Sequence, residues 1–114
     1  MSNRPLPAFE PPYVMAVFTS VRGPAAEGAA YAETSRRMTE RVAAVPGYLG
    51  HENAATPGGV SITVAYFRDE SALAAWRSDL EHREAQRQGR AEWYDSYTLH
   101  IGTVERSHGF VRQD

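Results

Sequence analysis

Two hydrophobic periods alternate along the chain, and their order predicts its elements. Residues 13–22 and 60–67 are rich in β-branched and aromatic side chains, which is typical of strands. Residues 48–56 form a weaker strand of small residues, which a Pro-Gly-Gly turn joins to the strand at 60–67. A last strand is predicted over residues 93–106.

Apolar residues at helical spacing fill the two long intervals between these strands. One helix is predicted over residues 26–44, where a Pro-Gly pair follows and stops it. The other begins at a cap supplied by Asp69 or Ser71. It carries Trp76 in its apolar stripe and continues as a polar helix as far as Gly89.

The order β-α-β-β-α-β predicts a ferredoxin-like α+β fold, in which a four-stranded antiparallel sheet carries two helices on one face. A chain of 114 residues suits a single core. We therefore expect one domain over residues 13–110. An extended proline-rich arm over residues 1–12 precedes it, and a tail over residues 111–114 follows it.

Both faces of the predicted sheet carry apolar side chains. In the first strand Val14 and Phe18 point to one side, while Val17 points to the other. Two helices can cover only one of these faces, so the other face needs a partner. We expect a homodimer in which the two sheets face each other.

Composition excludes several classes of function. A net charge of −2, with the two signs interspersed, predicts no nucleic-acid partner. The lack of Cys removes disulfides, thiolate metal sites and cysteine nucleophiles, and no HExxH, P-loop or GxGxxG motif suggests a metal or cofactor. No apolar run approaches the ~20 residues of a membrane span, and no signal-peptide core is found, so we expect a cytoplasmic protein without a membrane partner.

Four segments resemble the antibiotic biosynthesis monooxygenase (ABM) family, and specifically its small single-domain bacterial members. They are VPGYLGHE at 45–52, FRDESALAAW at 67–76, EHREAQRQGRAEWYDSY at 81–97 and VERSHGF at 104–110. The resemblance rests on their order: a helix-end PGY, a Trp followed by a His on the second helix, and then Gly-Arg and Trp-Tyr. It spans about residues 13–110.

This resemblance implies a dimeric α+β barrel and the oxidation of a small aromatic or quinone-like compound by O₂, without metal or flavin. Relatives in the same superfamily degrade haem with an Asn on the first strand, a Trp and a His. The first strand here contains no Asn, and Trp76 and His82 are closer together than in that triad. Haem degradation is therefore disfavoured.

His82 is the candidate catalytic residue. An imidazole that titrates near neutral pH can remove a phenolic or enolic proton before oxygen attacks. The other interpretation, which the sequence favours, is a histidine on the helix surface bonded to a backbone carbonyl. On one continuous helix His82 would lie about 240° around the axis from Trp76, so the two are not expected to share a face.

Trp76, Trp93 and Tyr97 are the candidate substrate-binding residues, because a flat ring can stack on such side chains. Trp76 is expected chiefly to anchor the second helix in the core. Strand alternation places Trp93 and Tyr97 on one face and Tyr94 on the other. At least two of Trp93, Tyr94 and Tyr97 are expected to pack in the core or in the dimer interface.

His51, His100 and Asn53 lie on predicted strands, and alternation puts His51 and Asn53 on one face. They either belong to a functional site or lie at a solvent-exposed strand edge, and the second interpretation is favoured.

Arg83, Arg87 and Arg90 form a solvated helix face or steer an anionic ligand. Two functions stay open at this stage. One is a cofactor-independent monooxygenase, and the other is a non-catalytic dimeric protein that binds a metabolite, quinone or haem.

Overall fold

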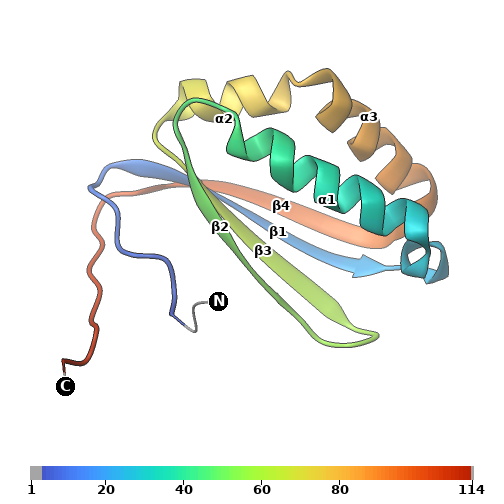
Figure 1. Cartoon of the computed structure of the whole chain (residues 1–114), viewed down its shortest axis with the longest axis horizontal. Coiled ribbons are helices and arrows are strands. Elements are labelled where there is room, and N and C mark those ends of the chain that lie inside the picture. The colour runs from blue at the N-terminus through green and yellow to red at the C-terminus, as the bar shows by residue number, and fades with distance from the viewer. Residues whose placement is uncertain (1–3, 114) are drawn as a thin grey trace.

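The predicted strands pair into one antiparallel sheet in the computed structural model, which describes residues 4–113 (Figure 1). The strands are β1 (Tyr13–Arg22), β2 (Tyr48–Ala55), β3 (Val60–Phe67) and β4 (Tyr94–Val104), in the sheet order β2-β3-β1-β4. With all helices on one face, this is the ferredoxin-like α+β fold that the sequence predicts. Residues 1–3 of the predicted arm and residue 114 of the tail lie outside the described part.

The helical layer differs from the prediction in its second half. It consists of the 3-10 turn η1 (Pro24–Glu27), α1 (Ala29–Ala43), α2 (Glu70–Arg77), α3 (Leu80–Gln88) and the π-helical turn η2 (Gly89–Trp93). A single second helix is therefore wrong, because the chain turns between Ser78 and Asp79. Of the helices described, none combines the length and apolarity needed to cross a membrane.

The core lies between the sheet and the helical layer. Its buried cluster consists of Val14, Val42, Phe67, Ala72 and Leu73. Phe67 of β3 is only 1% exposed, and Trp76 of α2 packs against the cluster from its margin. Burying an apolar side chain of this size contributes about 1.5–3 kcal/mol, so this cluster holds the helices on the sheet.

The opposite face of the sheet carries no helix, and the proline-rich arm covers one end of it. The ring of Phe9 lies 5.5 Å from that of Tyr13 and 5.7 Å from that of Tyr66, measured between centroids. The backbone amide of Leu6 donates to the Glu52 carboxylate at 2.8 Å. Beyond the arm the face stays open, and we call this part the open face.

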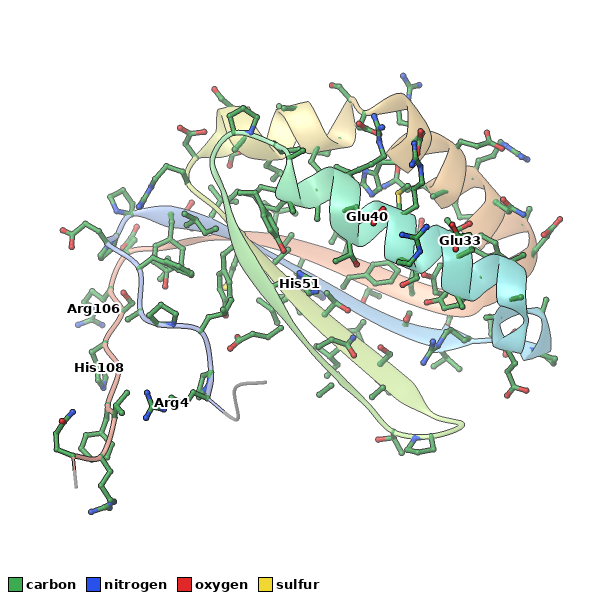
Figure 2. All side chains as sticks on the ribbon, viewed as in Figure 1. Arg4, Glu33, Glu40, His51, Arg106 and His108 are labelled. Atoms are coloured by element: carbon green, nitrogen blue, oxygen red, sulfur yellow. The ribbon has the colours of Figure 1, made fainter. Side chains whose placement is uncertain are left out.

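The segment that follows β4 runs beside the arm. The Ser107 hydroxyl donates to the backbone carbonyl of Phe9 at 2.8 Å. Figure 2 shows Arg106 and His108 on this segment and Arg4 on the arm, at the same end of the molecule.

The turn before α3 is built around Asp79. Its side chain caps the helix, because Oδ1 accepts from the His82 amide at 2.9 Å. The same carboxylate binds the guanidinium of Arg41 on α1, with N–O distances of 2.6 and 3.0 Å. Arg37 and Arg41 also bind Glu81. Two arginines of α1 thus fix the first turn of α3.

Replacing Asp79 tests how strongly this turn stabilises the fold. The Arg41 guanidinium and the His82 amide lower the pKa of Asp79 from 3.8 to about 2. The ionised carboxylate therefore stabilises the folded state above pH 3.8, and its contribution is lost as the pH falls toward 2. We expect Asp79→Ala to lower the free energy of unfolding by about 1 kcal/mol at neutral pH, measured by urea denaturation, and by less near pH 2.

Two further variants separate the contributions. Asp79→Asn keeps a capping oxygen but no charge, so it should retain part of the stability and lose the pH dependence. Glu33→Ala removes an exposed partner of Arg36 on the outer side of α1 and should change stability little. Equal losses for Asp79→Ala at neutral and at acid pH would contradict the role of the charge.

Candidate functional site

A cavity of about 650 Å³ lies between the helices and the sheet. We call it the main cavity. Aromatic and apolar side chains dominate its wall, among them Phe18, Trp76, Tyr94, Tyr97 and Leu99, and His82 adds an ionisable group. This size and lining suit a small organic molecule.

The main cavity opens to solvent along β4, because the helices only partly cover the side of this strand that faces them. Leu99 and Ile101 line the cavity, yet they are 48% and 45% exposed. A ligand on this wall would remove apolar surface from water, which favours binding.

The turn at Asp79 brings His82 onto Trp76. The imidazole and indole rings stack with their centroids 3.9 Å apart and their planes 14° from parallel. The prediction that the two side chains do not share a face is therefore wrong, because it assumed one continuous helix. Both line the main cavity.

The hydrogen bond of His82 determines which nitrogen is basic. Its Nδ1 lies 3.0 Å from the carbonyl oxygen of Trp76. A carbonyl only accepts, so Nδ1 carries the hydrogen and Nε2 keeps the lone pair. The expected backbone bond is thus present, but His82 is half-buried in the cavity wall.

The charge state of His82 follows from its burial. Burial lowers the pKa of the imidazole below its ordinary 6.5, against the opposing effects of the Trp76 carbonyl and the Asp79 charge. At neutral pH the ring is uncharged and can accept a proton.

A bulge in β4 places Tyr94 and Tyr97 on the same side of the sheet. The pairing of β4 with β1 shifts at Asp95, which is the extra residue. Both tyrosine rings contact Phe18, with centroids 5.5 and 5.1 Å away. The prediction that they point to opposite faces is wrong, since alternation changes phase at a bulge.

Trp93 belongs to η2 and not to the last strand. It is 4% exposed, and its ring meets that of Tyr31 edge-on at 5.2 Å. The Tyr31 hydroxyl lies 3.4 Å from that of Tyr94. Trp93 therefore supports the wall from behind, whereas Trp76 and Tyr97 line it.

Tyr94 of this wall has a hydroxyl group that is held in its protonated form. Burial, and then the hydrogen bond with Tyr31, raise the pKa of the Tyr94 hydroxyl above its ordinary value. The phenol therefore keeps its proton even in moderately alkaline solution.

A second cavity of about 420 Å³ adjoins the main cavity on the β2 side, and the two share five lining residues: Phe18, Met38, Thr63, Ala65 and Trp76. His51 and Asn53 both line it, so the prediction that they share a face is confirmed. Figure 2 shows His51 below α1. Both side chains are exposed, as expected at a strand edge.

The remaining polar candidates lie elsewhere. His100 is on the open face, where it pairs with Val17 of β1. A depression of about 680 Å³ beside η1 and the β2–β3 turn is lined by Arg22, Tyr31 and Arg36, among others. Within residues 4–113, no group of three or more His, Asp or Glu side chains is placed to hold a metal ion.

Three residues that shape the main cavity escaped prediction as site residues: Phe18, Met38 and Asp79. Alternation had placed Phe18 on the same side of β1 as Val14, opposite to Val17, which was a usable signal. Asp79 also had one, because a Ser-Asp pair inside a predicted helix is typical of a cap. Met38 lies on the cavity side of α1 and carried no distinguishing signal.

Comparison with known proteins gives a consistent result. The sequence model of the antibiotic biosynthesis monooxygenase family matches residues 13–88. The uncharacterized protein YqjZ of Bacillus subtilis is 39% identical over 101 residues, which cover 89% of this chain and 87% of that protein. Jasmonate monooxygenase ABM of Pyricularia oryzae is 26% identical over 80 residues, which cover 68% of this chain and 37% of that larger protein.

Solved structures share the fold. SnoaB from Streptomyces nogalater, described as a cofactor-independent oxygenase, superposes with a TM-score of 0.69 at 15% identity. The match covers 85% of this chain and 97% of SnoaB.

Gly89 tests how the π-helical turn positions Tyr94. Its φ of −59° and ψ of −46° suit alanine, which normally stabilises a helix by about 1 kcal/mol relative to glycine. A Cβ here would lie 2.7 Å from the Tyr94 ring. We therefore expect Gly89→Ala to destabilise the protein in thermal unfolding.

A double-mutant cycle identifies the cause. In the Tyr94→Ala background, Gly89→Ala should become neutral or stabilising, because the ring that it would meet is gone. Stabilisation by Gly89→Ala in the otherwise native protein would contradict the close packing of Tyr94.

Proposed function

The chain belongs to the antibiotic biosynthesis monooxygenase family, and we propose that it is a cofactor-independent monooxygenase for a small, electron-rich aromatic compound. The monooxygenase and oxygenase names of two of its relatives support this class of reaction. The observation that carries the proposal is His82: a neutral imidazole, stacked on Trp76, in the wall of an aromatic cavity.

In this proposal His82 is the general base. Nε2 accepts the hydroxyl proton of a phenol or hydroquinone, since Nδ1 is committed to the Trp76 carbonyl. The resulting anion is electron-rich enough to reduce O₂ itself, which is why no metal or flavin enters the scheme. Trp76 and Tyr97 flank the ring, and Trp93 supports Tyr94 through Tyr31.

The reaction balances for a phenol with a free ring C–H. The phenolate transfers electrons to O₂, and a bond forms between that ring carbon and one oxygen atom. Loss of the C–H hydrogen and cleavage of the O–O bond give a carbonyl and one molecule of water. The substrate leaves as a quinone, and the proton taken up by His82 returns to the water that is released.

The main cavity supplies the surroundings that this chemistry needs. Its aromatic and apolar wall lowers the local dielectric around the reacting anion, so electrostatic interactions there are stronger than in bulk water. In this proposal the Tyr94 hydroxyl, which stays protonated, donates to the developing negative charge.

Oxygen uptake with a panel of 1-naphthols and hydroquinones tests the reaction. The wild type should consume O₂ and place one oxygen-18 atom from labelled O₂ in the product, measured by mass spectrometry. His82→Ala should lower the rate about a hundredfold or more. Because the active base is the neutral form and its pKa lies below 6.5, the rate should hold at neutral pH and fall only in acid below that value.

His100→Ala is the matched control, because this histidine lies on the open face and should leave the rate unchanged. An unchanged rate in His82→Ala would remove His82 from the mechanism. Binding of the panel with no O₂ uptake would instead favour a non-catalytic binding protein.

We also propose a homodimer through the open face. Its rows carry Val17 opposite Val64 and Thr19 opposite Ile62, and Ile62 is 42% exposed. An apolar sheet face of this kind is usually covered in a stable protein. A second copy covers it symmetrically, sheet on sheet.

Sedimentation velocity tests the dimer. The wild type should sediment at about twice the 12.6 kDa of the chain at micromolar concentration. Ile62→Glu should dissociate it, since the substitution buries a charge in the interface. Leu99→Glu is the control, because Leu99 is similarly exposed at 48% but faces the main cavity. A wild-type monomer would overturn the proposal.

A further inference from the structure

Two arginines stand at the rim of the main cavity. Arg77 ends α2 and Arg83 lies in the first turn of α3, one on each side of the turn at Asp79. Both side chains are exposed, and both line the cavity. They are cationic groups on an otherwise aromatic and apolar site.

Four of the other five arginines of this layer, Arg36, Arg37, Arg41 and Arg87, have carboxylate partners, and the fifth, Arg90, donates to the Tyr97 hydroxyl. Arg36 binds Glu33 and Glu40, and Arg87 binds Glu84. In the part of the chain that the structure describes, neither Arg77 nor Arg83 forms a salt bridge.

The acids closest in sequence to these two arginines are already engaged. Asp79 binds Arg41, Glu81 binds both Arg37 and Arg41, and Glu84 binds Arg87. The two rim arginines are thus left with positive charge that the protein itself does not neutralise.

Helix stability explains only one of the two positions. A cation in the last turn, as at Arg77, interacts favourably with the negative end of the helix dipole. Arg83 stands near the positive end of α3, where a cation is disfavoured. Its place there, beside His82 and facing the cavity, has no explanation in the stability of the helix.

We propose that the main cavity takes a carboxylated aromatic compound, with its ring inside the cavity and its carboxylate at Arg77 and Arg83. The inference rests on the cavity of the proposed function and names its substrate class. Guanidinium groups bind carboxylates through paired, charge-assisted hydrogen bonds, which suits them to this task. Arg87 and Arg90 are not part of the site, because Arg87 binds Glu84 and Arg90 donates to the Tyr97 hydroxyl.

Binding of 2-naphthoate and 2-naphthamide tests this without any turnover, since neither probe is a substrate for the oxidation. The two have the same ring system and differ in charge. Titration by tryptophan fluorescence or calorimetry should give an affinity for the acid about tenfold higher than for the amide, decreasing with added salt. The double variant Arg77→Gln, Arg83→Gln should lose this preference and keep its affinity for the amide.

Arg87→Gln is the matched control on the same helix and should retain the preference. Equal affinities of the wild type for acid and amide would overturn the proposal, as would a preference that survives in the double variant. Selective binding of 2-naphthoate without O₂ uptake on the naphthol panel would remove the proposed reaction and leave the carboxylate site standing. Oxidation of neutral naphthols without any preference for 2-naphthoate would support the proposed reaction and remove the carboxylate site.

Discussion

The ion pair between Asp79 and Arg41 is the interaction on which the site depends. On a continuous helix, His82 would lie about 240° around the axis from Trp76. Instead Asp79 begins a new helix, and Arg41 of α1 holds its carboxylate in place. The imidazole then stacks on the indole, and the hydrogen bond from its Nδ1 to the Trp76 carbonyl fixes the orientation of the ring. One contact between helices thus sets both the fold of this segment and the geometry of its candidate base.

The sequence predicts the element order and the strands well, because periodicity and composition are local signals, and its candidates His82, Trp76 and Tyr97 all line the main cavity. The prediction fails where a single residue interrupts the helical repeat or the alternation of a strand. The turn at Asp79 depends on Arg41, which is 38 positions away in the chain, and helical spacing carries no trace of that contact. The extra residue at Asp95 reverses the face of Tyr94, and a strict alternation cannot show it.

The two faces of the sheet have separate tasks. The helix side holds the core around Phe67 and, toward β4, the main cavity. The other side presents rows of Val and Ile side chains that a second copy is proposed to cover. Since strand residues alternate between the faces, neighbouring positions in β1 serve different ends: Phe18 faces the cavity and Val17 the open face. Substitutions can therefore affect association and ligand binding independently, even one residue apart.

The commitment of Nδ1 to the Trp76 carbonyl has a consequence for proton traffic. An imidazole that relays protons uses both nitrogens, taking one up and releasing another on the far side. His82 has only Nε2 to offer, so a proton that it accepts must leave by the same atom. In the proposed reaction His82 therefore holds the proton of the bound compound and returns it within the same cavity. A protein working in this way ends each cycle in the charge state in which it began, without a proton channel to the solvent.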